Sequence, residues 1–442
     1  MARRFIATKT ARLYQAAGSN SYQLILIFGD EVETTGLPQQ NRVPVTFRGR
    51  DGFIAASALT TDPSLEIYFI DVGQGDSAFV VTPGRKKILI DGGVNRQALG
   101  FLTWKYRLDL AVPNLVIDLM VVSHADSDHL AGLVPIVAHP KIDVRRVVHS
   151  GIATFATGAF DTPLGDRAVV AGEPYLRTRH DGIADLDGLA LSDGFALWRD
   201  AIAGEAGIQY GAADASTGTV DVGDPAVELE VLGPRLVPDP EGPGQVYPWF
   251  DDPAHTINGH SLVVRLTHGA VRVLFSGDVN IEGGRHLLGD PAIAERLDAH
   301  VLKAPHHGSH EFDRNFLDAV RPQIAVISSG DQPDHGHPRA VFVGAVGKAT
   351  RSNEPLVFST EIAADFVEAG EAPTPGDAAE LGAVNLDAAG APAETRRVFK
   401  KRLHGMINVR TDGESLYAAR RVSASYKWES YGPLQPLPRW QA

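Results

Sequence analysis

The first part of the chain alternates apolar and polar side chains in short runs that end at turn-forming residues. The segments "YQLILIFGDEVETTG" and "VPVTFRGRDGFIAASAL" show this alternation and are broken by Gly-Asp and Arg-Asp-Gly turns. A period of two is typical of strands with one buried face, and Gly and Asp favour the backbone conformations of tight turns. Residues 1–61 therefore predict a small, barrel-like β module.

From Leu65 onward, apolar runs that fit strands alternate with helical patterns and predict a second domain over residues 62–442. The strand-like runs are, in order, "LEIYFID", "SAFVVT", "KKILID", "IDLMVVS", "VRRVVHS", "SLVVRL", "VRVLFS", "AHVLKA" and "QIAVISS", whereas "HLAGLVPIVAH" has the spacing of a helix. Strands interleaved with helices favour a layered α/β fold.

Two stretches depart from this rhythm. Residues 151–260 are rich in Gly, Asp and Pro and predict a long insertion with some helix. Residues 362–395 are rich in Ala, Pro, Gly and acid without any Lys or Arg, which predicts a flexible acidic loop. After this loop, "MINVRTDGESLYAARRV" predicts a hairpin that turns at Asp412-Gly413.

Composition narrows the function classes. Among 442 residues there are 54 acidic and 41 basic side chains, which give a formal net charge of −13. Phosphate affinity comes mainly from Lys and Arg, so any nucleic acid would have to be met at a local basic or metal-bearing site. There is no cysteine, so a metal would need His, Asp or Glu ligands. No apolar run approaches the roughly 18 residues of a membrane helix, and we expect a cytoplasmic protein without a membrane segment.

The segment "SHADSDHLAG" packs metal-ligand side chains between an apolar strand and a helix. Its candidate ligands are His124, Asp126, Asp128 and His129, and two ions could each take a His and a carboxylate from this set. Two plainer explanations compete with a metal site. Asp128 could simply cap the following helix. A calcium-binding EF-hand loop is disfavoured, because Ala131 stands where that loop needs Gly.

Further candidates also follow apolar strands. Asp91 comes after "KKILI", Asp278 after "VLFSG", and His306 and His307 stand in "PHHGS" after "AHVLKA". His149 ends "RRVVHS" in the same manner. Taken singly, a strand-end Asp is more often a turn former and a His pair more often lies at the surface. Several strand ends that deliver Asp or His together are what a preorganised metal site requires.

These motifs in this order resemble the metallo-β-lactamase-fold hydrolases. The carrying segments are "FIDVGQGDSAFVV", "ILIDGG", "SHADSDHLAG", "NGHSLVVRL", "VLFSGD", "LKAPHHGS" and "GHP". The chain is most similar to the hydrolase domain of ComEC, the bacterial DNA-uptake channel protein, over about residues 65–360. The resemblance implies an αββα sandwich with a dinuclear metal site at the sheet edges. The N-terminal module resembles a Src-homology-3-like barrel, which implies a possible protein partner.

The resemblance also implies ligand roles. His124 and Asp126 would belong to one metal, and Asp128 and His129 to the other. Asp278 would bridge the two ions. The last ligand would be His306 or His307, and His149 is a candidate for a further histidine ligand.

Other positions that match the family would surround the ions. Asp91 would orient the ligands from outside the coordination sphere. The positions expected to hold substrate or the ligand-bearing loops are Lys303, Asn258, Ser261 and His337. The ComEC channel itself has no counterpart in this chain, so DNA uptake does not carry over.

Two divalent ions, zinc or manganese, would activate a water for hydrolysis, and we expect Asp128, Asp278 and Lys303 to take part in catalysis. The metal chemistry suits phosphodiesters, lactams and thioesters alike. The close relatives favour a phosphodiesterase or nuclease, with a nucleotide or nucleic acid as the substrate. The alternatives are a hydrolase of another ester, a thioester or a lactam, and a non-catalytic binding module.

Overall fold

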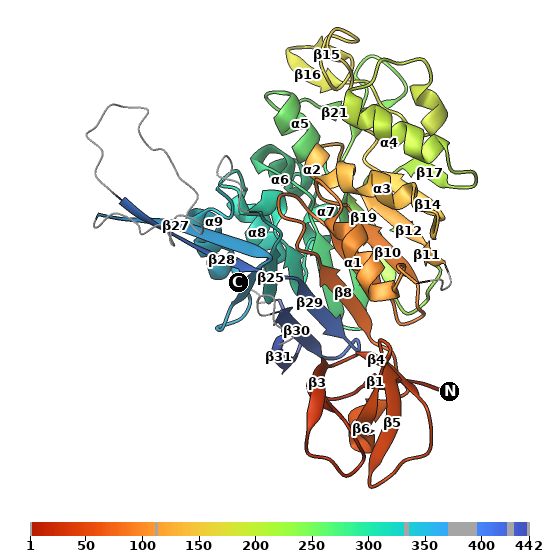
Figure 1. Ribbon diagram of the computed structural model, residues 1–442. Coiled ribbons are helices and arrows are strands. Elements are labelled where there is room, and N and C mark those ends of the chain that lie inside the picture. The colour runs from red at the N-terminus through yellow and green to blue at the C-terminus, as the bar shows by residue number, and fades with distance from the viewer. Residues whose placement is uncertain (1, 111–113, 331–335, 370–395, 422–427, 440–442) are drawn as a thin grey trace.

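The computed structural model describes residues 2–110, 114–330, 336–369, 396–421 and 428–439. It begins with a small module whose strands form one antiparallel sheet in the order β3-β2-β6-β5-β4-β1-β7. The strands are β1 (Ala2–Ile6), β2 (Thr10–Tyr14), β3 (Tyr22–Ile27), β4 (Glu31–Thr34), β5 (Arg42–Phe47), β6 (Arg50–Ala55) and β7 (Leu59–Thr60). Alternate side chains from these strands, among them Leu13, Val45 and Ile54, close into a core of their own. The predicted β module is therefore present, at one end of the molecule (Figure 1).

The rest of the chain is built on two large sheets. The first has nine strands in the order β17 (Gln209–Ala212), β14 (Arg146–His149), β12 (Leu119–Val122), β10 (Lys87–Ile90), β9 (Ala78–Val81), β8 (Leu65–Phe69), β29 (Ile407–Thr411), β30 (Leu416–Arg421) and β31 (Trp428–Leu434). The second has seven strands in the order β18 (Thr219–Val220), β19 (Glu228–Gly233), β22 (Val263–His268), β23 (Val271–Phe275), β24 (Val301–Lys303), β25 (Ile324–Ile327) and β26 (Leu356–Ser359).

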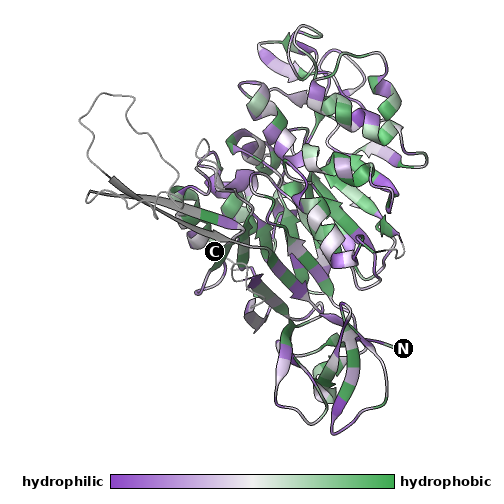
Figure 2. Cartoon of the chain, in the orientation of Figure 1, coloured by the Kyte–Doolittle hydropathy of each residue, from purple (hydrophilic) through white to green (hydrophobic). Residues whose placement is uncertain are grey.

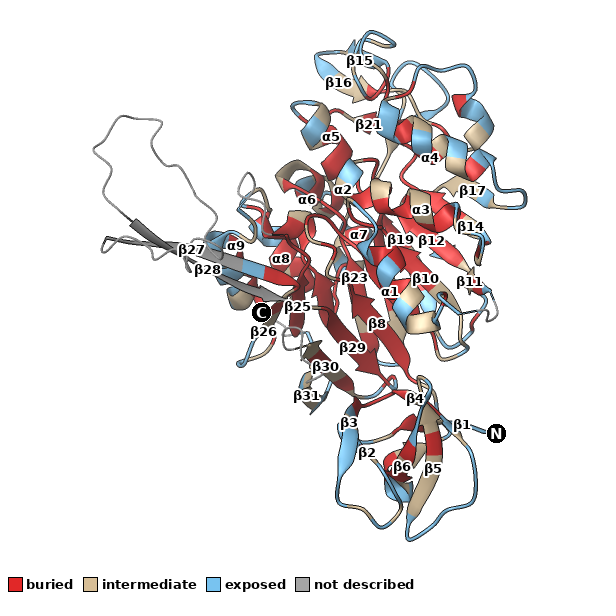
Figure 3. Cartoon of the chain, viewed as in Figure 1, coloured by how far each residue is buried: buried red, intermediate tan, exposed pale blue. Residues whose placement is uncertain are grey.

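The two sheets pack face to face, and helices cover both outer faces. Side chains such as Ile67 and Val121 from the first sheet meet Val264 and Val273 from the second in one apolar layer. The outer face of the first sheet packs against α1 (Gln97–Tyr106), α3 (Val134–Val137) and α4 (Asp193–Ala203). The outer face of the second packs against α6 (Ile281–Leu288), α7 (Pro291–Arg296), α8 (Arg314–Val320) and α9 (Ala340–Ala349). This is the predicted αββα sandwich, with hydrophobic, buried central strands (Figures 2 and 3).

Parallel pairing places the functional side chains at one edge of the sandwich. β10, β12, β14 and β17 run parallel in the first sheet, as do β23, β24, β25 and β26 in the second. The residues that follow these strands therefore emerge together. Asp91 follows β10, the "SHADSDH" segment follows β12, Asp278 follows β23, and His306 and His307 follow β24.

The segment expected as an insertion, residues 151–260, has mixed roles. Part of it forms a four-stranded sheet from β15 (Arg167–Val170), β16 (Glu173–Leu176), β21 (Gln245–Pro248) and β20 (Val237–Pro238). Other parts join the sandwich, because β17 pairs with β14 and β19 pairs with β22. Their Gly- and Asp-rich flanks obscure the strand pattern in the sequence.

Near the C-terminus, the predicted hairpin at Asp412-Gly413 is confirmed as β29 paired antiparallel with β30. Of the predicted acidic loop, residues 362–369 belong to β27 (Glu361–Ala369), which pairs with β28 (Arg396–His404). Residues 370–395 of that loop lie outside the described residues.

The module and the sandwich share specific contacts. Arg410 on β29 donates hydrogen bonds to the carbonyl of Phe28 and to Asp30 Oδ1, the latter at 2.9 Å. The ring of Phe28 stacks on that of Tyr417 with centroids 3.8 Å apart. These contacts join the module to the β29–β30 hairpin that borders β8.

Candidate metal centre

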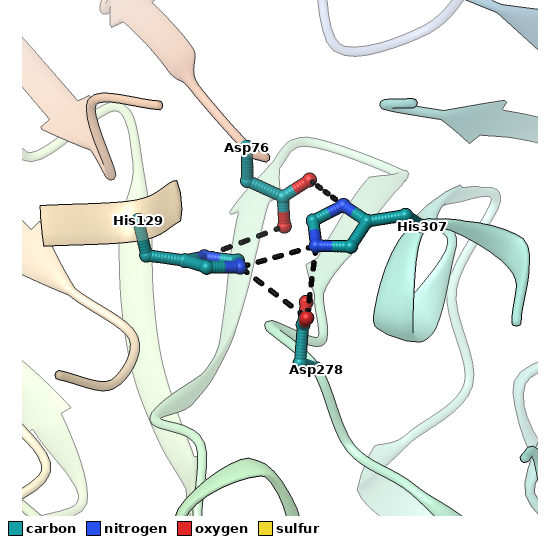
Figure 4. Close-up of side chains that lie close together, drawn as sticks. All are labelled: Asp76, His129, Asp278 and His307. Carbon is teal, nitrogen blue, oxygen red and sulfur yellow. Dashed lines mark hydrogen bonds and ion pairs between the residues drawn. The ribbon is translucent and has the colours of Figure 1, made fainter. Parts of the chain in front are cut away.

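Four buried side chains converge where the strands of both sheets end. Asp76, His129, Asp278 and His307 each bring one ligand atom to within 4.8 Å of the others (Figure 4). Asp76 and His129 come from segments that connect strands of the first sheet, and Asp278 and His307 from segments that connect strands of the second. Together with Asp128 and Lys303, which touch this group, we call them the metal-site cluster.

Its centre is formed by two imidazoles and a carboxylate. Nε2 of His307 lies 2.9 Å from Asp278 Oδ2, and Nε2 of His129 lies 3.3 Å from the same oxygen. The two Nε2 atoms are themselves 3.3 Å apart. Asp128 joins from α2 (Ser127–Leu130), with Oδ2 3.2 Å from His307 Nε2. Nitrogen and oxygen donors thus surround one small volume.

Outer contacts turn both imidazoles inward. Nδ1 of His129 lies 2.9 Å from Asp91 Oδ2, and Nδ1 of His307 lies 3.0 Å from the carbonyl oxygen of Ser328. Those acceptors require a proton on Nδ1 in each neutral ring, which leaves a lone pair on each Nε2. A ligand histidine held by a carboxylate or carbonyl through its other nitrogen is the usual arrangement at a protein-bound metal. The contact of Asp91 with His129 is the one that its predicted orienting role requires.

The electrostatics also favour a bound cation. Burial lowers the pKa of His129 and of His307, but the nearby carboxylates, Asp278 first, outweigh it and raise both well above the ordinary value. Burial raises the pKa of Asp278, yet His129, His307 and Lys303 hold it well below its usual range. Two facing lone pairs among anionic oxygens fit a divalent ion, which would replace the protons that these rings otherwise take up.

His124 and Asp126 flank the cluster as a second pair. The His124 side chain is fully buried, its ring centroid is 4.1 Å from that of His129, and its Nε2 has no hydrogen-bond partner among the described residues. Asp126 Oδ2 lies 3.6 Å from that nitrogen, and the side chain is 39% exposed. Asp126 occupies the N-cap position of α2 without making a side-chain capping bond, and Asp128 stands in the first turn. Helix capping therefore explains neither carboxylate.

Lys303 lies against the carboxylates of the cluster. Its Nζ forms a close ion pair with Asp76 Oδ2, lies 3.5 Å from Asp278 Oδ1, and donates to the Gly277 carbonyl at 2.9 Å. Burial lowers the pKa of Lys303, but Asp76 and Asp278 raise it above its usual value. The side chain is thus a buried ammonium that holds two of the clustered carboxylates.

Backbone contacts explain how the loops approach so closely. A Cβ on Gly75 would lie 1.8 Å from the carbonyl oxygen of Asp128, and Asp76 N–H donates to that oxygen at 3.2 Å. A Cβ on Gly132 would lie 1.9 Å from the carbonyl oxygen of Gly92. Only glycine lets the "GQGDS" turn and the "DGG" turn contact the segment that carries the candidate ligands.

Three site residues have left-handed backbone conformations. The φ angles are 56° at Asp91, 46° at His306 and 52° at His307. Such conformations cost on the order of 1–3 kcal/mol each for residues other than glycine and concentrate at functional sites. In the "PHHGS" turn, this strained backbone directs the His307 ring towards the cluster.

The remaining predicted residues have distinct places. Ser261 Oγ accepts from Asp278 N–H at 2.9 Å and lies 3.4 Å from His124 Nδ1. Asn258, on α5 (Pro253–Gly259), is buried, and its carbonyl accepts from Ser261 Oγ. The ring of His337 stacks on that of His307 with centroids 6.3 Å apart. His306 lies beside them, with its ring centroid 5.8 Å from that of His337.

His149 is not brought to this group. Its Nδ1 accepts from Gly151 N–H at 3.0 Å, its Nε2 lies 3.1 Å from the Asp181 carbonyl, and its ring stacks on His180 and Tyr210. Both ring nitrogens are therefore used by the backbone. Burial and the neighbouring His180 hold the pKa of His149 well below its ordinary value.

Asp76 is the residue that the sequence reasoning missed. It follows the Gly-rich turn of "VGQGDS" rather than an apolar strand, and such a turn ordinarily only connects two strands. The signal that could have identified Asp76 is its position directly after the glycines of "GQG" and just before β9.

A dense set of buried imidazoles and carboxylates at the strand ends of an αββα sandwich defines a metal-binding hydrolase fold. The family model of the metallo-β-lactamase superfamily matches residues 70–330, and the chain belongs to that superfamily. No helix of the described residues is long and apolar enough to cross a membrane.

Among curated proteins, ComE operon protein 3 of Bacillus subtilis is 23% identical over 288 residues, which cover 62% of this chain and 29% of that protein. Competence protein ComA of Neisseria gonorrhoeae is 38% identical over 82 residues, or 18% of this chain and 12% of that protein. The chain thus spans well under half the length of either relative. These matches support the resemblance to the ComEC hydrolase domain.

Similar solved structures include a metallo-β-lactamase of Cronobacter sakazakii, with 16% identity, a TM-score of 0.26, and coverage of 54% of this chain and 77% of that one. Another is the metallo-β-lactamase SMB-1 bound to 2-mercaptoethanesulfonate, with 13% identity, a TM-score of 0.27, and coverage of 54% of this chain and 79% of that one.

Proposed function

We propose that this chain is a metal-dependent phosphodiesterase or nuclease. The observation that carries the proposal is the pair of inward-facing imidazole nitrogens, 3.3 Å apart, with the carboxylates of Asp128 and Asp278 around them. Two divalent ions, zinc or manganese, would provide Lewis acidity and an activated water when bound. Asp128, His129, Asp278 and His307 would hold one ion, and His124 with Asp126 would contribute to the other.

The chain's own residues divide the remaining work. Lys303 neutralises Asp76 and Asp278 from the protein side and fixes the Asp278 carboxylate against the imidazoles. Asp91 keeps the His129 proton on Nδ1. The partly exposed Asp126 stands at the solvent side, where a substrate would arrive. Asn258, Ser261 and His337 border the ligands and would position substrate or ligand loops.

Two arguments favour a phosphodiester over the alternatives. The cluster is rich in carboxylate oxygens, the hard donors that suit manganese, and its imidazoles suit zinc. Two such ions would stabilise the attacking and leaving oxygens of a phosphoryl group. The resemblance to the ComEC hydrolase domain points the same way, and one relative, ComA, is named a competence protein. Hydrolysis of another ester, a thioester or a lactam, and binding without catalysis, are the competing outcomes of the test.

The test is a substrate screen on the full chain after metal analysis. Bis(p-nitrophenyl) phosphate, single- and double-stranded DNA, RNA, cyclic nucleotides, a thioester and a lactam would be compared with manganese or zinc added. We expect cleavage of at least one phosphodiester and loss of that cleavage in Asp278→Asn. Asp224→Asn is the matched control, because Asp224 is a buried carboxylate that accepts backbone N–H groups of Gly84 and Ala226 away from the cluster.

Binding of metal without turnover on any substrate would favour a binding module. Turnover confined to the lactam or the thioester would replace the phosphodiester assignment.

A further inference from the structure

A cavity of about 290 Å³ lies where the N-terminal module meets the sandwich. Its walls come from β3 and the β5–β6 turn of the module, and from α1, β8, β29, β30 and β31 of the sandwich. None of its lining residues belongs to the metal-site cluster. The cavity is near the lower end of the size of ligand pockets, roughly 300 Å³.

The lining is cationic although the whole chain is acidic. Five arginines contribute to it: Arg48, Arg50, Arg107, Arg410 and Arg421. Asp30 is the only carboxylate among the described residues of the lining, and it is already paired with Arg410 at 2.9 Å. Arg107 is paired with Asp109 at 3.3 Å. Among the described residues, neither Arg48 nor Arg50 has a carboxylate partner. The cavity therefore presents uncompensated positive charge.

Aromatic rings stand beside these guanidinium groups. The lining includes Phe47, Tyr68, Trp104 and Trp428. Trp104 is 40% exposed, although most large apolar side chains of α1 are buried. An exposed indole close to Arg48 and Arg50, which lack a carboxylate partner among the described residues, is suited to a ligand that is both aromatic and anionic.

The turn that carries Arg48 is built in an unusual way. Arg48 and Gly49 have φ angles of 48° and 74°, the pattern of a tight hairpin turn in which Asn and Gly are preferred at both positions. The Arg48 guanidinium carbon lies 4.0 Å from the centroid of the Trp104 ring, so this strained position reaches across to α1. A purely structural contact between Arg48 and Trp104 would leave Arg50 and the exposed indole unexplained.

We propose that this cavity binds a nucleotide unit, with the phosphate held by Arg48 and Arg50 and the base packed against Trp104 or Trp428. Guanidinium groups bind phosphate through paired N–H donors, and stacking on an aromatic ring accepts any base. The same chemistry is offered by a free nucleotide and by the end of a single strand. A free nucleotide would make the cavity a regulatory site, whereas a strand end would make it an anchor for a polymeric substrate.

The experiment is calorimetric titration of the full chain with a nucleoside monophosphate, inorganic phosphate and a short oligothymidylate. The oligonucleotide arm uses Asp278→Asn, which should not cleave it. We expect the monophosphate to bind, and the double substitution Arg48→Gln and Arg50→Gln to weaken it at least tenfold. The salt dependence of oligonucleotide binding should also fall by roughly one phosphate contact or more, at about 0.7 in slope per contact for single strands.

The matched control is Arg12→Gln. Arg12 is also an arginine of the module, and its guanidinium carbon lies 5.0 Å from the centroid of the Tyr22 ring, outside the cavity. The double substitution Arg48→Lys and Arg50→Lys retains the charge but lacks the paired donors, so it should recover only part of the affinity. Unchanged denaturation midpoints would show that these variants remain folded.

Several results would overturn the proposal: no binding by the native chain, affinity unaffected by the double substitution, or equal weakening by Arg12→Gln. Inorganic phosphate binding as tightly as the monophosphate would reduce the cavity to an anion site and reject the base contact. Tighter binding of the oligonucleotide would indicate an anchor for a strand end. Tighter binding of the monophosphate would indicate a site for a free nucleotide. Cleavage of bis(p-nitrophenyl) phosphate is measured in parallel. The double variant should retain it and Asp278→Asn should lose it, so a failure here is distinct from a failure of the proposed function.

Discussion

Two groups of buried charged side chains in this molecule differ in how their charges are balanced. The Glu66 cluster, at the junction of module and sandwich, contains Asp30, Glu66, Tyr68, Lys105 and Arg410, with two carboxylates facing two cations. The metal-site cluster contains three carboxylates, Asp76, Asp128 and Asp278, and one permanent cation, Lys303. The charges of the Glu66 cluster therefore balance within the protein, whereas the metal-site cluster requires added positive charge.

The contrast shows how burial can serve either stability or function. In the Glu66 cluster, Lys105 Nζ lies 3.1 Å from Glu66 Oε2, and Tyr68 donates a close hydrogen bond to the same oxygen. In the metal-site cluster, the imidazole nitrogens face each other and the carboxylates instead of opposing cations. A buried charge imbalance of this kind persists only where a ligand ion or protons complete it.

The largest effect should come from Asp278→Asn. The amide keeps the shape of the side chain but removes the anion that contacts both imidazoles, so turnover should fall by more than about 100-fold. Steady-state cleavage of a small phosphodiester at saturating metal measures this. Activity within a few-fold of the native chain would show that Asp278 is not a ligand.

Arg410→Ala should chiefly affect stability. The substitution leaves Asp30 and Glu66 buried without their shared guanidinium, and breaking a buried pair in this way costs on the order of 3–5 kcal/mol. Urea denaturation of the metal-free chain gives the free energy of unfolding. Asp278→Asn should change that quantity less than Arg410→Ala does, and the reverse order would contradict the distinction between the two clusters.

The Glu66 cluster should also limit stability in acid. Burial raises the pKa of Glu66, but Lys105, Arg410, Tyr68 and Arg85 together lower it to about 2. Because the pKa in the folded state lies below the ordinary value of 4.5, the stabilisation is present above pH 4.5 and is lost as the pH falls towards 2. Denaturation midpoints measured across this range should decline in the native chain, and Glu66→Gln should flatten the decline. An equal decline of the midpoints in both proteins would show that Glu66 does not cause the loss of stability in acid.

Asp91→Asn should weaken metal binding without abolishing it. Asp91 contacts His129 Nδ1 and the backbone N–H of Ser123, so its loss leaves the ligands present but poorly oriented. Loss of such an outer partner typically costs about 10–100-fold in metal affinity. Competition titration with a chelating dye measures the affinity, and an unchanged value would place Asp91 outside the metal-binding machinery.

Asp126→His should give the smallest change, a shift in metal preference of a few-fold. A carboxylate at this position makes the donor set harder, and an imidazole makes it more suited to zinc. Turnover of the native chain and the variant would be compared after metal removal, with manganese, zinc or magnesium restored. Identical preference in both proteins would show that Asp126 does not tune the metal.

The sequence predicted the sandwich and most of the clustered residues because strand-end position is a local property. Asp91, Asp128, His129, Asp278 and His307 each follow an apolar run, and parallel pairing brings such ends together. The prediction depends on the alternation of strand-like and helical segments and on the order of the motifs. Both can be read directly from the sequence.

The remaining features depend on contacts between distant segments. Asp76 enters the cluster because Gly75 allows its turn to touch the Asp128 carbonyl. His149 satisfies the strand-end rule as well as Asp91 does, but the Asp181 and Gly151 backbone occupies its ring nitrogens. The arginine-lined cavity likewise combines residues that lie far apart in the sequence, so no local sequence pattern predicts it.

The division of the candidate ligands between the two sheets has a mechanical consequence. His124, Asp126, Asp128 and His129 follow a strand of one sheet, and Asp278 and His307 follow strands of the other. An ion held by both sets would cross-link the two layers and oppose any sliding of one over the other. At an ion concentration 100 times its dissociation constant, such a link raises the free energy of unfolding by about 2.7 kcal/mol. The affinity of this site for metal would therefore depend on how accurately the two sheets are aligned.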